Sequence, residues 1–187
     1  MELKFQKHAN QKGYKMKKII IASLGKNHEL GLNNTLPWPH LSKDLRHFKV
    51  QTSNQFVLMG RKTFESIVTT LGKPLPNRIS LVVTNTRDLI RGHHVEPFTS
   101  VASAIRYAEE ITIIEEAGVY DTLFIAGGAS VYEQTIDIAD EMILSHIDWQ
   151  GKADTYFPAS DKWQDQFSAY DHKTHDGFYI NWYKRTL

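Results

Sequence analysis

The sequence predicts a single α/β domain. We expect a central, mixed and mostly parallel sheet of about eight strands, an antiparallel C-terminal hairpin and about four flanking helices. Two patterns predict this class. Short apolar, β-branched runs alternate with segments of helical periodicity, and the last two apolar runs flank the turn dipeptide Asp176-Gly177. The 187 residues and the 41% hydrophobic content fit one folded domain.

The predicted strands are short apolar runs bounded by turn-forming residues. In chain order they are residues 19–24, 55–59, 78–84, 94–98, 122–126, 141–147, 167–173 and 178–185. Between the first strand and the first helix lies a polar segment, residues 25–39, which contains several Asn, Gly and Pro residues. We expect this segment to be a loop.

Four segments follow the periodicity of a helix that is apolar on one side. Residues 41–50 place Leu41, Leu45 and Phe48 at spacings of four and three, and Ser42 is a candidate cap for the first turn. The others are residues 61–68, a segment after a predicted Ser100 cap with Val101, Ala104, Ile105 and Ala108 on one side, and a segment from Gly127-Gly128 to about Asp137.

The composition excludes several function classes. The chain has no cysteine, which excludes a disulfide framework and a thiolate metal site, and its net charge of +1 gives no general attraction to nucleic acid. Residues 1–15 hold four lysines against one glutamate, a balance of +3, so the remainder carries −2. We expect residues 1–15 to be a disordered basic extension or the product of an early start site, and residues 16–187 to be the folded domain.

Localisation and partners follow from what the sequence lacks. No stretch approaches the ~18 consecutive apolar residues of a membrane span. The nine histidines include the pairs His93-His94 and His172/His175, but no acidic pattern beside them completes a metal site. These absences predict a cytoplasmic protein with no membrane partner, no nucleic-acid partner and no metal, and we expect it to be a monomer.

Asp44 is the first candidate for chemistry, because it lies on an otherwise apolar helical side, one turn before Phe48. Either the carboxylate is exposed at the edge of that side, or it lies in an apolar pocket that awaits a partner. Gly60-Arg61-Lys62-Thr63 is the second candidate. It places two cations, a hydroxyl and free backbone N–H groups at a helix N-terminus, a combination that suits a phosphate.

The third candidate is the stretch IAGGASVY at residues 125–132, where a strand enters a helix through two glycines. Glycine lets the backbone approach a ligand closely. The stretch does not follow the G-x-G-x-x-G fingerprint, so the standard dinucleotide-binding motif is excluded. The two glycine turns, at residues 60 and 127–128, could instead hold one pyrophosphate between them.

Six motifs in order resemble those of the dihydrofolate reductase family. They are LGLNNTLPWPHLSKD (residues 30–44), MGRKTFESI (59–67), PLPNR (74–78), GGASVY (127–132), SHI (145–147) and DTYFP (154–158). The resemblance extends from Met16 to the C-terminus. It implies an NADPH-dependent enzyme that reduces 7,8-dihydrofolate to 5,6,7,8-tetrahydrofolate, with hydride transfer to pterin C6 and protonation of N5 through water.

For the substrate, the resemblance implies that Asp44 orients the pterin, that Trp38 helps to order the water, and that Arg78 pairs with the α-carboxylate. It also implies that a hydroxyl of Ser145 bridges Asp44 and the 2-amino group, and that antifolate inhibitors share the site. The other implied substrate contacts are Ile21, Ala22, Leu45, Phe48, Ile67, Lys73, Ala126 and Tyr132.

For the cofactor, the resemblance implies that Arg61 and Lys62 meet phosphates, that Thr84 and Asn85 line the adenosine end, and that Gly127-Gly128 is linked by a cis peptide. A cationic cluster near the adenine ribose favours NADPH over NADH. The other implied cofactor contacts are Ser23, Leu30, Gly31, Asn34, Thr35, Thr63, Arg87, Ala129, Ser130, Val131 and Tyr132.

Two alternatives remain open. A pyrimidine reductase of riboflavin biosynthesis would share the fold and the cofactor, but the arrangement of Pro37-Trp38 and Asp44 argues against it. A nucleotide- or RNA-binding module could use the lysines of residues 1–15. The slightly acidic remainder and the lack of an aromatic and basic platform argue against this second alternative.

Overall fold

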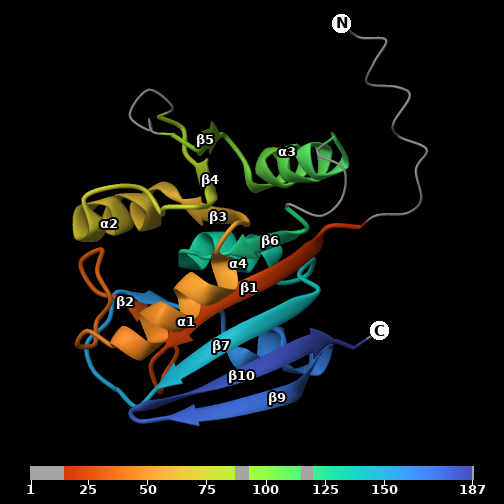
Figure 1. The fold of residues 1–187 in the computed structure, drawn as a ribbon. Helices are drawn as coiled ribbons and strands as arrows, with labels where there is room; N and C mark the ends of the chain where they lie inside the picture. Colours follow the sequence, from red (N-terminus) through yellow and green to blue (C-terminus); the bar gives the residue numbers. More distant parts are fainter. Residues whose placement is uncertain (1–14, 87–92, 115–119, 187) are drawn as a thin grey trace, which may run out of the picture.

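The computed structural model describes residues 15–86, 93–114 and 120–186, and its centre is one eight-stranded sheet (Figure 1). The strand order is β5-β4-β3-β6-β1-β7-β10-β9. The strands are β1 (Lys17–Leu24), β3 (Phe56–Gly60), β4 (Ile79–Val83), β5 (Val95–Phe98), β6 (Thr122–Ile125), β7 (Glu141–Ile147), β9 (Phe167–His175) and β10 (Phe178–Arg185).

The first six strands in this order are parallel, and β10 and β9 complete the sheet in antiparallel pairing. Strands such as β3 have both sides covered, which is why they are continuous apolar runs rather than alternating ones. The hairpin turns at Gly177, whose φ of 81° is a left-handed conformation that glycine adopts without strain. The predicted fold class and the hairpin are therefore confirmed.

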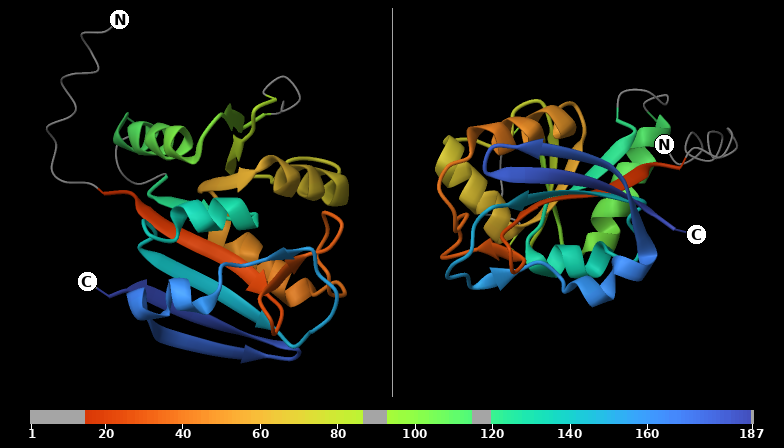
Figure 2. Two further views of the ribbon diagram at one scale, coloured as in Figure 1. Left: turned by 180° about the vertical axis from the view of Figure 1, so that it is seen from behind. Right: turned by 90° about the horizontal axis from the view of Figure 1, so that it is seen from below.

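Four α-helices lie within the described residues, two on each side of the sheet (Figure 2). Their bounds are α1 (Ser42–Thr52), α2 (Arg61–Leu71), α3 (Val101–Ile114) and α4 (Ala129–Thr135), and two short 3-10 turns follow later, η3 (Ser160–Lys162) and η4 (Gln164–Gln166). Apolar residues of α1 and α2 pack on one side of the sheet, and those of α3 and α4 pack on the other.

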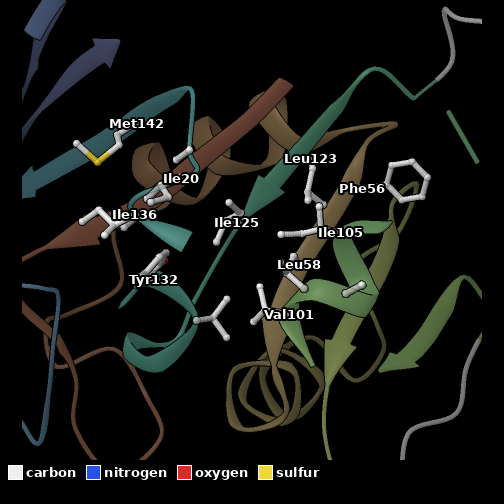
Figure 3. Close-up of a cluster of buried hydrophobic side chains, with 14 of the residues drawn as sticks. Ile20, Phe56, Leu58, Val101, Ile105, Leu123, Ile125, Tyr132, Ile136 and Met142 are labelled. Carbon is white, nitrogen blue, oxygen red and sulfur yellow. The ribbon is translucent and has the colours of Figure 1, made fainter. Parts of the chain in front are cut away.

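Figure 3 shows the larger core cluster, beneath α3 and α4. Ile20 of β1 and Leu58 of β3 are fully buried there and meet Val101 of α3 and Tyr132 of α4. Full burial of one such aliphatic side chain contributes about 1.5–3 kcal/mol. The predicted apolar side of α3 is buried in this cluster, so the periodicity in that segment was interpreted correctly.

The first helix-cap prediction is wrong and the second is confirmed. Helix α1 has Leu41 at its N-cap with no side-chain cap hydrogen bond, and Ser42 is already helical. At α3 the Ser103 N–H donates to the Ser100 hydroxyl over 3.1 Å, which is the expected cap geometry.

Part of the predicted loop at residues 25–39 forms a strand, which corrects that expectation. Strand β2 (Glu29–Gly31) pairs with β8 (Thr155–Tyr156) as a separate two-stranded sheet. A tight turn follows β2, in which Asn33 and Asn34 have φ of 51° and 61° and Leu32 and Thr35 exchange backbone hydrogen bonds. Two successive positive φ values are typical of type I′ turns, for which asparagine is favoured.

In the described part of the chain, no helix combines the length and apolar character that crossing a membrane requires. Most of the predicted basic extension, residues 1–14, lies outside the described residues.

Candidate active site

Asp44 is buried in the first turn of α1, with 4% of its surface exposed. The Ser23 hydroxyl, on β1, donates a hydrogen bond of 2.7 Å to Asp44 Oδ2. The carboxylate is therefore buried between β1 and α1 rather than exposed at the edge of the helix, which decides between the two alternatives that the sequence left open.

No ion pair involves Asp44 within the described ranges. Its position in the first helical turn is favourable, since the helix dipole stabilises negative charge there. His47 lies one turn further along α1. Burial lowers the pKa of the His47 imidazole, and the charge of Asp44 acts in the opposite direction. Asp44 is thus a buried acid that can accept further hydrogen bonds.

Apolar side chains from several elements form a core cluster on the side of the sheet that α1 covers. Ile21 of β1 and Trp38, before α1, are buried in the same core cluster, against which Phe48, Ile67 and Ala126 are packed. Trp38 also meets Trp149 edge to face, with ring centroids 6.0 Å apart. The structure therefore brings five of the predicted site residues to the α1 and α2 side of the sheet.

Arg78, directly before β4, is a buried residue with 4% of its surface exposed. It donates to Thr52 Oγ1 over 3.2 Å, to the Pro76 carbonyl over 2.6 Å and to the Lys49 carbonyl over 3.1 Å. Burial lowers the pKa of Arg78, but a guanidinium keeps its proton in proteins. A buried cation whose described partners are neutral oxygens suits an anionic group of a ligand.

The two glycine turns lie against each other. The Gly60 N–H, at the start of α2, donates to the Gly127 carbonyl over 2.7 Å. A Cβ atom at Gly128 would lie 3.4 Å from the Thr63 hydroxyl, so a larger side chain would fill the space between the turns. The Gly127-Gly128 peptide is cis, as the resemblance implied.

Comparison with known proteins adds a finding to this geometry. Residues 17–185 match the family model described as dihydrofolate reductase. The chain belongs to the dihydrofolate reductase family.

Curated relatives agree with this membership. Dihydrofolate reductase HdrB of Haloferax volcanii is 40% identical over 169 residues, which cover 89% of this chain and 82% of the relative. Dihydrofolate reductase type 3 of Salmonella typhimurium is 41% identical over 140 residues, covering 74% and 76%. Dihydrofolate reductase of Haemophilus influenzae is 32% identical over 153 residues, covering 81% and 86%. The predicted activity of an oxidoreductase that reduces dihydrofolate is confirmed at this level.

Some of the residues that the resemblance implied as substrate contacts lie apart from the cluster on the α1 and α2 side of the sheet. Ala22 packs in the cluster under α3 and α4, because successive side chains of β1 point to opposite sides of the sheet. Leu45 is 39% exposed, and Lys73 follows α2 as an exposed residue. Ser145 is buried on β7 in register with Ser23, but in the described chain the hydroxyl that donates to Asp44 is that of Ser23.

On the cofactor side, the predicted cations are exposed or bonded to acids. Arg61 pairs with Glu65 over 2.7 Å, and Lys62 is exposed. Thr84 is buried, its hydroxyl accepting from the Thr86 N–H over 3.1 Å. Asn85 is exposed, and Arg87 lies outside the described residues.

The remaining predicted cofactor contacts lie on two segments. Val131 and Tyr132 are buried on α4, where Ala129 and Ser130 form the first turn. The Tyr132 hydroxyl donates to the Ile21 carbonyl over 2.9 Å, and burial raises its pKa, so the group remains a donor. Leu30, Gly31, Asn34 and Thr35 lie on β2 and the turn after it.

Sequence reasoning missed the acids that hold the β2 segment. Glu29 is buried and accepts from the Asn27 N–H over 2.7 Å. Burial raises the pKa of Glu29, but hydrogen bonds from backbone groups of Glu29, Asn27 and Gly151 outweigh it and hold the pKa below its ordinary value. Asp154 accepts from the Asn33 N–H over 2.7 Å. The Asn33-Asn34 pair was a signal for the turn that the Asp154 contact holds.

Proposed function

We propose that the protein reduces 7,8-dihydrofolate to 5,6,7,8-tetrahydrofolate with NADPH, and that Asp44 orients the pterin ring. The observation that carries this proposal is a buried carboxylate with one hydroxyl donor, beside an apolar cluster and outside any described ion pair. Family membership supports the same substrate.

The residues present fit NADPH. The two glycine turns, which have no side chains to block a ligand, would bind phosphate oxygens through their backbone, with Thr63 beside Gly128 and Arg61 and Lys62 on α2. Leu30 and Gly31 on β2 would face the nicotinamide end, and Thr84 and Asn85 the adenosine end. When bound, NADPH supplies the hydride that C6 of the pterin accepts.

Asp44 has the chemistry that the pterin requires. Its two oxygens can accept in parallel from the 2-amino group and from N3–H, which fixes the plane of the ring. Charge-assisted hydrogen bonds of this kind contribute about 1.5–3 kcal/mol each. N5 takes its proton from water that Trp38 helps to order, while Asp44 polarises the ring without touching N5.

Arg78 would hold the other end of the substrate. Its guanidinium is buried, and a bidentate fork matches the α-carboxylate of the glutamate tail. Phe48 and Ile67 would contact the aminobenzoyl ring between these two charged anchors. Antifolates would use the same site. We propose further that the enzyme is a cytoplasmic monomer.

The test of this function is Asp44→Asn, which keeps the shape of the side chain and removes its charge. We expect kcat/KM for dihydrofolate at neutral pH to fall by roughly 10²–10⁴-fold, since pterin polarisation depends on the charge. The NADPH dissociation constant should change less than about twofold. NADPH consumption with dihydrofolate measures the first quantity, and NADPH fluorescence titration measures the second.

Asp165→Asn, an exposed substitution in η4, is the matched control and should leave both quantities unchanged. An unchanged turnover of Asp44→Asn would refute the role of Asp44. Turnover of a ribosylated pyrimidine in place of dihydrofolate would support the riboflavin-pathway alternative, and salt-sensitive RNA binding without reductase activity would support the nucleic-acid alternative.

A further inference from the structure

Among the residues that the structure describes, Ser23 is the one whose side chain forms a hydrogen bond with the buried Asp44 carboxylate. Its hydroxyl donates to Asp44 Oδ2 over 2.7 Å, from β1 to α1. Because side chains alternate along a strand, Ser23 lies on the same side of the sheet as Ile21, whose side chain belongs to the cluster near Asp44. The bond therefore joins two elements at the site itself.

The hydroxyl leaves most of the carboxylate free. Each carboxylate oxygen offers two lone-pair positions, so Oδ2 can accept from Ser23 and from one donor of a ligand, while Oδ1 keeps both positions. A short O–H···O⁻ bond is among the stronger hydrogen bonds and restricts rotation of the carboxylate plane. The plane is thus set before any ligand arrives, and less orientational freedom is lost on binding.

We propose that Ser23 is a positioning residue that holds the Asp44 carboxylate in the orientation that accepts the pterin. This inference rests on the proposed function. It assigns Ser23 to the substrate through Asp44, whereas the resemblance implied a cofactor contact. Since the single hydroxyl hydrogen is donated to Asp44, the Ser23 side chain can offer a cofactor only an acceptor.

The test compares Ser23→Ala with Ser23→Thr and with Ser80→Ala. Ser80 is a fully buried serine on β4 whose hydroxyl has no partner in the described structure, so its replacement controls for loss of a buried hydroxyl. We expect Ser23→Ala to weaken dihydrofolate binding and raise KM by about tenfold, with a smaller change in kcat. Ser23→Thr should restore binding, and NADPH affinity should be unchanged in Ser23→Ala.

A double-mutant cycle tests whether Ser23 acts through Asp44. Folate binding is measured by intrinsic fluorescence in wild type, Ser23→Ala, Asp44→Ala and the double variant. We expect Ser23→Ala to have less than about a twofold effect once Asp44 is alanine, because the acceptor is gone. If Ser23→Ala lowers the melting temperature, Ser23→Cys, which has a similar size but a weak donor, should reproduce the binding loss in a stable protein.

Several outcomes would overturn the proposal. A Ser23→Ala variant that loses NADPH affinity and keeps dihydrofolate affinity would make Ser23 a cofactor contact. An equal loss in both Asp44 backgrounds would make the effect independent of the carboxylate. In either case an active wild type leaves the proposed function intact, whereas a wild type that neither binds nor reduces dihydrofolate would overturn both proposals.

Discussion

Arg78 has an unusual environment for a single side chain, because a fixed positive charge is buried among neutral oxygens. Burial of a charge is unfavourable unless a partner compensates for it. The α-carboxylate of dihydrofolate would be that partner. We expect Arg78→Leu to raise KM for dihydrofolate by roughly 10- to 100-fold, since one or two charge-assisted hydrogen bonds are lost. Steady-state kinetics with varied dihydrofolate measures this change.

Arg78→Lys separates charge from geometry at the same position. Lysine keeps the charge but loses the bidentate fork, so its KM should lie between those of wild type and Arg78→Leu. NADPH affinity should be the same in all three proteins. If the Arg78 variants lost affinity for NADPH alone, Arg78 would contact the cofactor, and its assignment to dihydrofolate would be wrong.

The buried environment of His146, on β7, leads us to expect that the stability of the protein depends on pH. Its ring is stacked on Tyr179, and in the described structure its buried Nε2 has no hydrogen-bond partner. Burial lowers the pKa of His146 to about 4, and the charges of His28 and His172 add to this effect. An unfolded histidine titrates near 6.5. Between these two pH values the unfolded chain binds more protons than the folded chain. The contribution of neutral His146 to the free energy of unfolding is therefore fully present above about pH 6.5 and is lost as the pH falls toward 4.

His146→Phe keeps the stacked ring and cannot take a proton. We therefore expect its free energy of unfolding to fall less between pH 7 and pH 5 than that of wild type. Urea denaturation at the two pH values measures the difference, and His93→Phe, at an exposed histidine, should behave like wild type. An identical pH dependence in His146→Phe and wild type would contradict the assignment.

At the scale of elements, the turn between β6 and α4 depends on a residue without a side chain. Gly127 has φ of 104°, and a Cβ atom there would lie 2.9 Å from the Tyr132 hydroxyl. That hydroxyl donates to the Ile21 carbonyl, so an alanine would disturb the link between α4 and β1 as well as the turn itself. We expect Gly127→Ala to cost about 1–3 kcal/mol from the backbone conformation alone, and to weaken NADPH binding.

Gly177→Ala separates the effect of backbone strain from the effect of the Tyr132 contact. Gly177 has φ of 81°, but nothing lies within 4 Å of a Cβ atom there. This control should therefore show the backbone strain without the contact, and its NADPH affinity should be that of wild type. Equal losses of stability and affinity in the two variants would mean that the Tyr132 contact is unimportant.

Over the whole molecule, the sequence predicted best those strands and helices whose apolar residues follow a regular pattern over many residues. The buried parallel strands are continuous apolar runs, and α3 has a regular apolar side, so both were recognisable from local patterns. The pairing of β2 with β8 was not, because strands of three and two residues have no periodicity and their partners are distant in the chain.

The candidate site shows the same limit. The motifs identified Asp44, Arg78 and the glycine turns, since each lies in a stretch that resembles a motif of the dihydrofolate reductase family. The partner of Asp44 could not be identified in this way, because Ser23 and Ser145 occupy paired positions on neighbouring strands and only their three-dimensional orientation decides which hydroxyl donates. A side chain's partner across two elements depends on packing that no local pattern encodes.

The proposed domain boundary, before Met16, leads to an expectation for a chain that lacks residues 1–15. Met16 is 2% exposed and packs in the core, where the Thr112 hydroxyl approaches its sulfur. Lys15, the residue before it, makes an exposed ion pair with Asp140, and such pairs contribute only about 0–1 kcal/mol. A chain that begins at Met16 should therefore keep its kcat/KM, with a melting temperature lower by at most about 2–4 °C.

A chain that begins with methionine directly before Ile19 is the contrasting variant. It lacks the Lys18 side chain, whose ammonium pairs with the partly exposed Glu109 over 2.8 Å, and it lacks the Met16 side chain in the core. We expect this chain to lose several kcal/mol of stability, because a core side chain and the first residues of the central strand β1 are removed together. Thermal unfolding and NADPH-dependent turnover of both chains test the boundary. An inactive chain beginning at Met16 would mean that residues 1–15 belong to the folded enzyme.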